Sequence, residues 1–272
     1  MSKPLLPGSK WVKHRIVAQS RDLESSLPDT ALYSYDRLRQ YLHRYQTVFV
    51  KPTIGGGGVN IFCIRKLAEG GYLVMMQRRR LQTSSLQRVH EWISRFARLR
   101  GRVFLIQRGI DLAFWRGRPV DLRTIVQKNE RGEWEVTGMF SKIAGKDLAV
   151  TNVSAGGTAH SVEEYLSALG YKHETVTTLV RRLRTLSLGV ARQCGRRYAN
   201  ALYGLDIGLD RNGKLWLIEV NTTPHLSIFQ RLRMPKSFQR AKKLWEHHRG
   251  TNLRAEQWKR KRLRREQRTS PT

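Results

Sequence analysis

A run of four glycines between two apolar segments constrains the fold more than any other feature. Thr47–Lys51 is predicted to form a buried strand that ends at Pro52. The glycines Gly55–Gly58 follow, and Asn60–Ile64 is predicted to form the return strand. Two strands joined by so short a loop pair antiparallel. Glycines without a Cβ let backbone N–H groups approach phosphate oxygens, and Lys51 could add a charge. Alone, the glycines could equally form a plain mobile turn, and they complete neither a P-loop nor a dinucleotide fingerprint.

The rest of the chain mixes helices with further hairpins. Hydrophobic periodicity predicts helices over 9–23, 35–45, 85–99, 161–169 and 174–197, the first capped by Ser9. Alternation predicts further strands over 71–76, 102–107, 121–127, 134–140, 201–209 and 215–220. Because these elements interleave without a βαβ rhythm, we predict an α+β fold with antiparallel sheets.

We expect this fold to divide into two lobes and a tail. Residues 1–106 would form an N-terminal lobe with the glycine loop, and residues 107–230 a C-terminal lobe with a metal site. The hinge would lie near 107–111, and residues 231–272 would form a basic helical or flexible tail.

A carboxylate inside an apolar strand marks the second lobe. Glu219 lies within Leu-Ile-Glu-Val, where burial without a partner would cost several kcal/mol. Asn221 shares its face of the strand, and Asp206 lies on the preceding strand of the same hairpin. Carboxylate and amide oxygens suit magnesium, so the three predict a metal site. The alternative is two ordinary strand residues with solvated charges.

Two other segments carry polar groups suited to a phosphate or an acid. Asp121 and Arg123 share one face of a strand, where they could form a site or merely an ion pair. Lys142, Lys146 and Asn152 precede Gly156-Gly157, a pattern that alone would indicate a surface loop.

The net charge of +30 predicts attraction to polyanions at low salt. Residues 231–272 hold fifteen Lys or Arg against three Glu, a surplus of 15 − 3 = 12. This tail could be solvated or could contact a polyanion, and Trp245 and Trp258 argue against simple disorder.

Other compositional features argue for a cytoplasmic location. No apolar run approaches the roughly 18 residues of a membrane span, and the N-terminus lacks a signal-peptide h-region. Two cysteines form neither a disulfide framework nor a metal cluster.

In order along the chain, six segments resemble the ATP-grasp superfamily of carboxylate-amine ligases, and most closely the endospore coat-associated YheC/YheD-like branch. The segments are Ser9–Trp11, Val48–Gly58, Ile106–Asp111, Asp121–Arg123, Val150–Gly157 and Leu217–Pro224. The similarity covers about residues 9–229, and six ordered blocks are far more specific than any one.

The resemblance implies a nucleotide held between two lobes, with a defined role for each block. The cofactors would be ATP and magnesium. Nucleotide contacts would come from Lys10, Lys51, Gly55, Gly56, Gly57, Gly58, Gln107, Arg108, Asp121 and Asn152. Arg123 and Lys142 would lie near the terminal phosphate, and Asp206, Glu219 and Asn221 would hold magnesium. In this superfamily a carboxylate attacks the γ-phosphate, and an amine captures the resulting acyl phosphate.

Two departures from the family pattern bear on substrates. Arg108 stands where the hinge of the family often carries an acidic residue, and we expect the domain that usually precedes the first block to be absent before Ser9. That domain often helps to bind the acceptor, so we expect a partner protein to supply it, or the chain's own basic surface to bind an acidic small-molecule or polymeric acceptor. By resemblance only, the location could be spore-associated.

Two other classes of function stay open at this point. The chain could be a nucleotide-binding structural or coat-associated protein without turnover, or a nucleic-acid binder that owes its affinity to charge.

Overall fold

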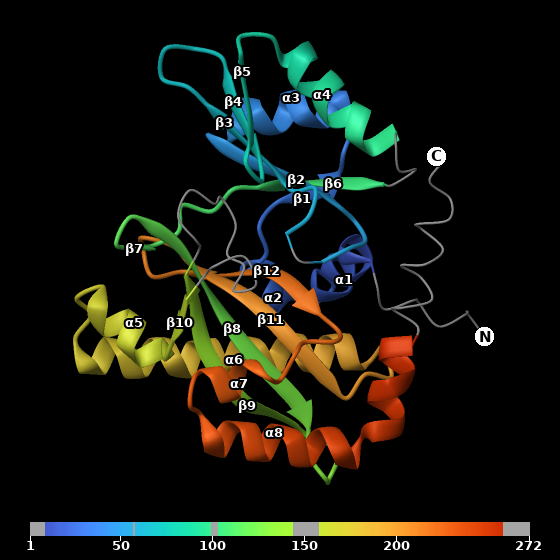
Figure 1. Ribbon diagram of the computed structural model, residues 1–272, viewed down its shortest axis with the longest axis vertical. Coiled ribbons are helices and arrows are strands. Elements are labelled where there is room, and N and C mark those ends of the chain that lie inside the picture. The colour runs from blue at the N-terminus through green and yellow to red at the C-terminus, as the bar shows by residue number, and fades with distance from the viewer. Residues whose placement is uncertain (1–8, 57, 99–102, 144–157, 258–272) are drawn as a thin grey trace.

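A computed structural model describes residues 9–56, 58–98, 103–143 and 158–257. Two antiparallel sheets lie one above the other, each with helices packed on it (Figure 1). This architecture confirms the predicted α+β class. None of the helices in the described ranges is both long enough and apolar enough to cross a bilayer.

The first sheet packs two helices on one face. In spatial order its strands are β1 (Thr30–Leu32), β6 (Phe104–Arg108), β2 (Thr47–Pro52), β3 (Phe62–Lys66), β4 (Tyr72–Met76) and β5 (Arg79–Thr83). The helices are α3 (Tyr35–Arg44) and α4 (Leu86–Arg98). Val48, Val50 and Ile64 are fully buried in the core shared with α3 and α4. Phe49 and Cys63 alternate with them and line a cavity beside the sheet.

The second sheet is covered by helices on both faces. Its strands run β10 (Thr158–His160), β9 (Trp134–Ile143), β8 (Arg118–Lys128), β11 (Leu202–Leu209) and β12 (Leu215–Asn221), and β7 (Phe114–Trp115) pairs with β8. Helices α5 (Val162–Ala168) and α6 (His173–Gly195) cover the face where Thr124 and Ser187 hydrogen-bond at 2.9 Å. On the opposite face the Gln127 amide donates to the Ala241 carbonyl at 3.0 Å.

The N-terminal helices pack with the second sheet although they precede the first. Helices α1 (Lys10–Val17) and α2 (Arg21–Glu24) place Ile16, Val17 and Leu23 in the same core as α6. The Ser9 hydroxyl accepts from the Val12 N–H at 3.4 Å, which confirms the predicted cap. The single helix predicted to Leu23 is wrong, because Ser20 is extended and begins a new helix. The predicted domain boundaries 1–106, 107–230 and 231–272 stay a prediction. Helices α1 and α2 precede the first sheet in sequence but share the core of the second sheet.

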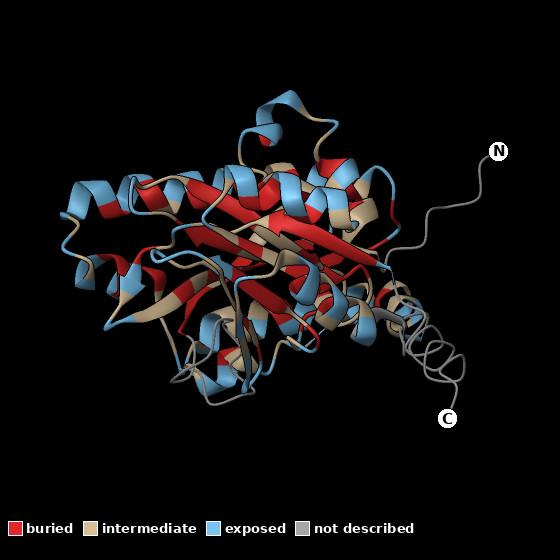
Figure 2. Ribbon diagram, turned by 90° about the horizontal axis from the view of Figure 1, so that it is seen from above, coloured by how far each residue is buried: buried red, intermediate tan, exposed pale blue. Residues whose placement is uncertain are grey.

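Two glycines let the chain after β12 close over the lower face of the second sheet. A Cβ on Gly138 would lie 2.4 Å from the Phe229 ring, and one on Gly204 would lie 2.7 Å from Pro224. Phe229 belongs to α7 (Ile228–Arg231) and is fully buried against Phe140. In Figure 2 such buried residues gather in the strands and on the inward sides of the helices.

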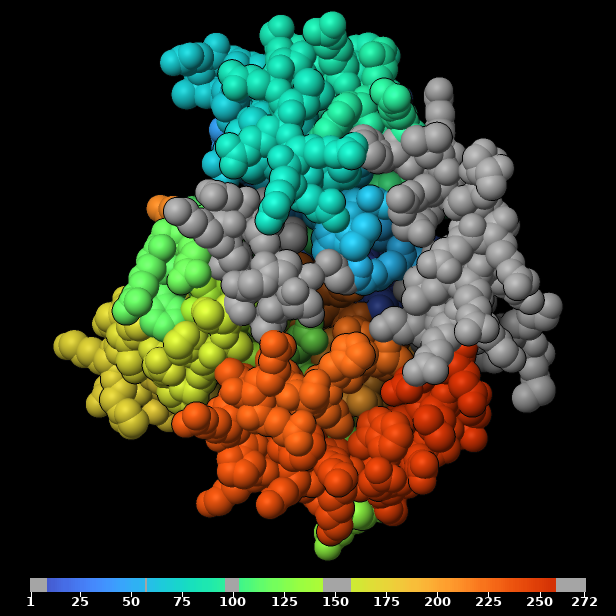
Figure 3. Space-filling model, viewed as in Figure 1, coloured from blue at the N-terminus to red at the C-terminus, as the bar shows by residue number. Residues whose placement is uncertain are grey.

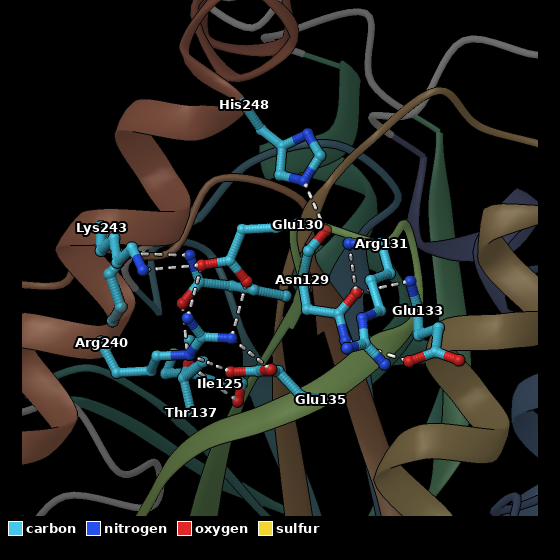
Figure 4. A network of polar contacts seen from close by, with 12 residues as sticks. Ile125, Asn129, Glu130, Arg131, Glu133, Glu135, Thr137, Arg240, Lys243 and His248 are labelled. Carbon is cyan, nitrogen blue, oxygen red and sulfur yellow. Dashed lines mark hydrogen bonds and ion pairs between the residues drawn. The ribbon is translucent and has the colours of Figure 1, made fainter.

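Helix α8 (Pro235–His247) ties the start of the basic tail to the β8–β9 turn. Arg240 contacts Glu135 at 2.7 Å and Glu130 at 2.7 Å, and Lys243 adds a contact of 3.1 Å to Glu130 (Figure 4). The Arg240 hydrogen bonds hold the pKa of the Glu130 carboxyl well below its usual range. These residues of the tail are thus ordered as a helix on the second lobe, and helical backbone continues over 249–257.

Apart from the single helix predicted over 9–23, the helices and long strands predicted from periodicity are confirmed, but four short strands were missed. These are β1, β5, β7 and β10, of two to five residues each. Strand β5 follows β4 through Gln77, which has a φ of 52° in a turn without glycine or proline. Each of these short strands forms because a neighbouring strand has an unpaired edge to which it can hydrogen-bond. The local sequence does not show that such an edge is available.

We expect Gly138→Ala to lower the free energy of unfolding by about 1–3 kcal/mol, because its methyl overlaps the Phe229 ring in a packed core. Denaturant unfolding measures the change. Gly250→Ala is the matched control, since the nearest atom to its Cβ would lie 3.7 Å away. Equal effects of the two substitutions would contradict this account.

Candidate functional site

A cavity of about 1320 Å³ lies between the two sheets. Atoms of the first sheet lie above it and those of β11 to α8 below it in Figure 3. Every predicted site residue that the structure describes lines this cavity. They are Lys10, Lys51, Gly55, Gly56, Gly58, Gln107, Arg108, Asp121, Arg123, Lys142, Asp206, Glu219 and Asn221. Gly57 and Asn152 lie outside the described residues.

The upper wall holds a buried lysine beside the glycine loop. Lys51 donates to the Gln107 side-chain oxygen at 2.8 Å, and the Gln107 amide donates to Thr30 at 3.0 Å. Burial is the main cause that lowers the pKa of Lys51 to about 8; Glu219 opposes the shift and Lys10 adds to it. Both polar ends of the Gln107 side-chain amide are therefore occupied within the protein.

The floor is one cross-strand row of charged residues. Arg123 on β8 lies opposite Asp206 on β11, which lies opposite Glu219 on β12. The Arg123 guanidinium binds both Asp206 oxygens, at 2.7 and 2.8 Å. Lys142 adds contacts of 2.7 Å to Asp206 and 3.3 Å to Asp121. Burial alone would raise the pKa of the Asp206 carboxyl, but Arg123 and Lys142 outweigh it and hold the pKa well below its usual range.

A bulge in the hairpin decides which side chains reach this floor. The register of β11 with β12 shifts between Asp206 and Ile207, so that Ile218 has no partner of its own. As a result Ile218 and Glu219, which are consecutive, both line the cavity. Asn221 does so too, which agrees with the predicted shared face of Glu219 and Asn221.

Lys10 connects the helical N-terminus, the glycine loop and the floor. Its ammonium donates to the Gly55 carbonyl at 2.7 Å and contacts the Glu219 carboxylate at 3.0 Å. One turn further along α1, the buried Lys13 donates to the Val220 carbonyl. Burial alone would raise the pKa of Glu219, but Lys10, Lys51 and Lys13 outweigh it and lower the pKa.

The oxygen donors on β11 and β12 fit a magnesium ion. Asp206 and Glu219 offer carboxylates, and Asn221 offers an amide oxygen that accepts one bond from the Thr223 N–H at 3.0 Å. Such hard oxygen donors are those that magnesium prefers, together with phosphate oxygens. Among the described residues, no three His, Cys, Asp or Glu side chains cluster to hold a metal. A metal here would therefore depend on the amide and on a bound phosphate.

Arg108, in the segment predicted as the hinge, stacks between residues of the two predicted lobes. Its guanidinium carbon lies 5.4 Å from the centre of the Tyr45 ring and 5.0 Å from that of Trp216 on β12. Cation–π contacts of this kind contribute about 0.5–2 kcal/mol. Arg108 therefore contacts residues packed with each of the two sheets, a role that its place in the sequence did not indicate.

Sequence reasoning missed several residues in or beside the cavity, for identifiable reasons. Lys13 could have been found, because it lies three positions after Lys10 and so on the same side of a helix. Ile218 depends on the bulge, and Tyr45 and Trp216 meet only through the tertiary fold. No local signal marks them.

The comparison with known proteins agrees with this geometry. A family model for YheC/D-like ATP-grasp proteins matches residues 4–247. The chain belongs to the YheC/D-like ATP-grasp family. Among relatives, the endospore coat-associated protein YheD of Bacillus subtilis (strain 168) is 29% identical over 225 residues, 81% of this chain and 49% of YheD. YheC of the same organism is 22% identical over 220 residues, 79% of this chain and 59% of YheC. The chain thus spans about half the length of these two YheC/D relatives.

Solved structures place this YheC/D-like chain in the same fold. The crystal structure of D-cycloserine synthetase DcsG aligns with a TM-score of 0.54 at 12% identity, over 86% of this chain and 68% of DcsG. At such low identity the likeness concerns the fold alone. It confirms the ATP-grasp fold that the six sequence blocks predicted.

The depressed pKa of Lys51 gives a pH-dependent prediction. Below pH 8 the folded state carries the full cost of a buried ammonium, and between about 8 and the ordinary 10.5 the unfolded chain binds more protons, so stability rises with pH. Lys51→Met removes this dependence. The unfolding free energy of the wild type minus that of the variant should therefore rise by about 3 kcal/mol from pH 7 to 10.5.

Denaturant unfolding at several pH values measures this difference. Lys242→Met, which removes an exposed lysine, is the matched control. A difference between the wild type and Lys51→Met that stays constant with pH would contradict the buried ammonium.

Proposed function

We propose that this chain is an ATP- and magnesium-dependent ligase of the carboxylate-amine type. The observation that carries the proposal is the convergence of Lys10, Lys51, Lys142 and the Arg123–Asp206–Glu219 row on one cavity beside a glycine loop. These buried charges pair with one another, and a magnesium–nucleotide complex could replace those partners because it supplies both phosphate oxygens and a cation.

Each group has a role in this proposal. Lys10, Lys51 and the loop of Gly55–Gly58 bind the phosphates, while backbone groups of Gln107 and Arg108 meet the adenine. Asp121 and Asn152 contact the nucleotide. Asp206, Glu219 and Asn221 hold magnesium, which supplies charge neutralisation on the phosphates when bound.

The reaction has two balanced steps. A substrate carboxylate oxygen attacks the γ-phosphorus, the bond from that phosphorus to the β–γ bridging oxygen breaks, and ADP leaves. An amine then attacks the acyl carbon of the resulting acyl phosphate, inorganic phosphate leaves, and the amine proton passes to solvent. Arg123 and Lys142 stabilise charge on the transferring phosphoryl group, and positioning does most of the rest.

The acceptor, partners and location complete the proposal. The net charge of +30 supports an acidic acceptor. A partner protein that helps to bind the acceptor, a polyanion contact through the basic tail and a cytoplasmic location stay proposals. The names of YheD and YheC support an association with the spore coat.

Those names also favour a second candidate, a coat-associated protein that binds ATP without turning it over. The two candidates share the site and differ in chemistry. ATP binding without ADP release in the presence of a cell extract would favour the second.

We expect Asp206→Asn combined with Glu219→Gln to abolish the magnesium dependence of ATP binding. Metal-free ATP should bind as well as before or better, because Lys10, Arg123 and Lys142 lose their carboxylate partners. Isothermal titration calorimetry with magnesium or with EDTA measures both affinities.

Asp22→Asn combined with Glu163→Gln removes two exposed carboxylates as a control. Because a broken buried pair costs about 3–5 kcal/mol, thermal unfolding checks that the site variant folds. Glu219→Gln alone, at a side chain that is 25% exposed, is the milder test. Unchanged magnesium dependence in a folded variant would defeat the metal assignment.

Turnover of ATP by the ligase reaction should be detectable by trapping the acyl phosphate intermediate. With ATP, magnesium, candidate acids and hydroxylamine, we expect hydroxamate and ADP in equal amounts, since hydroxylamine intercepts an acyl phosphate. Lys142→Met should lower kcat by about 10²–10³ with a small change in KM, because it removes charge stabilisation at the phosphoryl group. ADP without hydroxamate would indicate a kinase or an ATPase instead.

A further inference from the structure

The cavity is larger and more positive than a nucleotide requires. Its volume of about 1320 Å³ exceeds the roughly 300–1,000 Å³ of typical small-molecule sites. Eleven Lys or Arg residues line it against four carboxylates, Asp111, Asp121, Asp206 and Glu219. ATP and one magnesium ion together bring only about two negative charges. Space and positive charge therefore remain for a second anion.

Part of the surplus positive charge lies on the first sheet, on strands distant from β6. Cys63 on β3 lies opposite Met75 on β4, which lies opposite Arg80 on β5, and all three line the cavity. Arg65, two residues beyond Cys63, is on the same face. From strand spacing and rise, the Cα atoms of Arg65 and Arg80 are about 12 Å apart. A ligand with several carboxylates could place a separate group on each side chain.

The second lobe adds two more arginines. Arg118 begins β8, the strand that carries Arg123, and Arg231 ends α7. Helix α7 lies beside the Arg123 row, because Phe229 packs on Phe140, the β9 partner of Arg123. Within the described part of the chain, Arg118 and Arg231 have no carboxylate within 4.0 Å, and neither do Arg65 and Arg80. By contrast, all four cavity carboxylates are paired.

We propose that these four arginines form a subsite for a polycarboxylate acceptor, an acidic peptide lying across the cavity mouth. Arg65 and Arg80 would hold it from the first lobe and Arg118 and Arg231 from the second, with one carboxylate delivered to Arg123. The assignment rests on the proposed ligase function, in which the activated group is a carboxylate. Arginine pairs with carboxylate and phosphate alike, so a polyphosphate or a nucleic acid is the alternative that the experiment separates.

The experiment measures binding of labelled hexaglutamate by fluorescence anisotropy at fixed salt, with ADP and magnesium present. We expect Arg65→Gln combined with Arg80→Gln, and Arg118→Gln combined with Arg231→Gln, each to weaken binding about tenfold, because each removes two charge contacts. Arg181→Gln combined with Arg184→Gln makes the same charge change on exposed positions of α6, which covers the other face of the second sheet. This control should lose less than about twofold.

Three outcomes would overturn the subsite. They are an equal loss in the α6 control, competition by free glutamate as effective as by hexaglutamate, and tighter binding of polyphosphate or of single-stranded DNA than of hexaglutamate. Calorimetry with ATP and magnesium on the same proteins separates the two proposals. If ATP binds and hexaglutamate does not, the subsite is wrong and the ligase proposal stands. If ATP does not bind, the ligase proposal itself fails.

Discussion

The ion pair between Arg123 and Asp206 is the interaction on which the rest of the site depends. A charge in the middle of a sheet is costly unless it is paired, and the two-point contact at 2.7 and 2.8 Å satisfies both partners. Lys142 joins from β9, so three adjacent strands are held in register by one cluster. The groups that would meet phosphate and metal are thus already positioned, each occupied by its neighbour.

Such mutual pairing lets a highly charged floor exist in a folded protein without a ligand. A bound nucleotide would offer phosphates to Arg123 and Lys142, and a metal would offer charge to Asp206. Binding would then exchange one set of partners for another, which avoids the cost of stripping water from unpaired charges. Lys10 is likewise paired in the absence of a ligand, with the Gly55 carbonyl and the Glu219 carboxylate. It thereby connects the glycine loop to the second sheet.

Close packing below the floor positions α7, the helix that ends in Arg231. Gly138 and Gly204 admit Phe229 and Pro224, and this contact lays α7 along the edge of the Arg123 row. Helix α8 is then fixed by Arg240 to the β8–β9 turn (Figure 4). Arg108 stacks between Tyr45 and Trp216 and so links the two sheets.

The sequence by itself determined the helices and strands that depend on residues close together in the chain. Periodicity and turn residues predicted the long helices and hairpins. The order of six blocks predicted the family, and the resemblance named thirteen of the described residues that line the cavity. Tertiary structure alone decided what depends on neighbours distant in the chain. The short strand β5 needs the edge of β4, Ile218 reaches the cavity only through a bulge, and α1 lies against the second sheet although the first sheet follows it. It also decided that Asp206 pairs with Arg123 and Lys142, because an isolated strand does not specify which charge will face it.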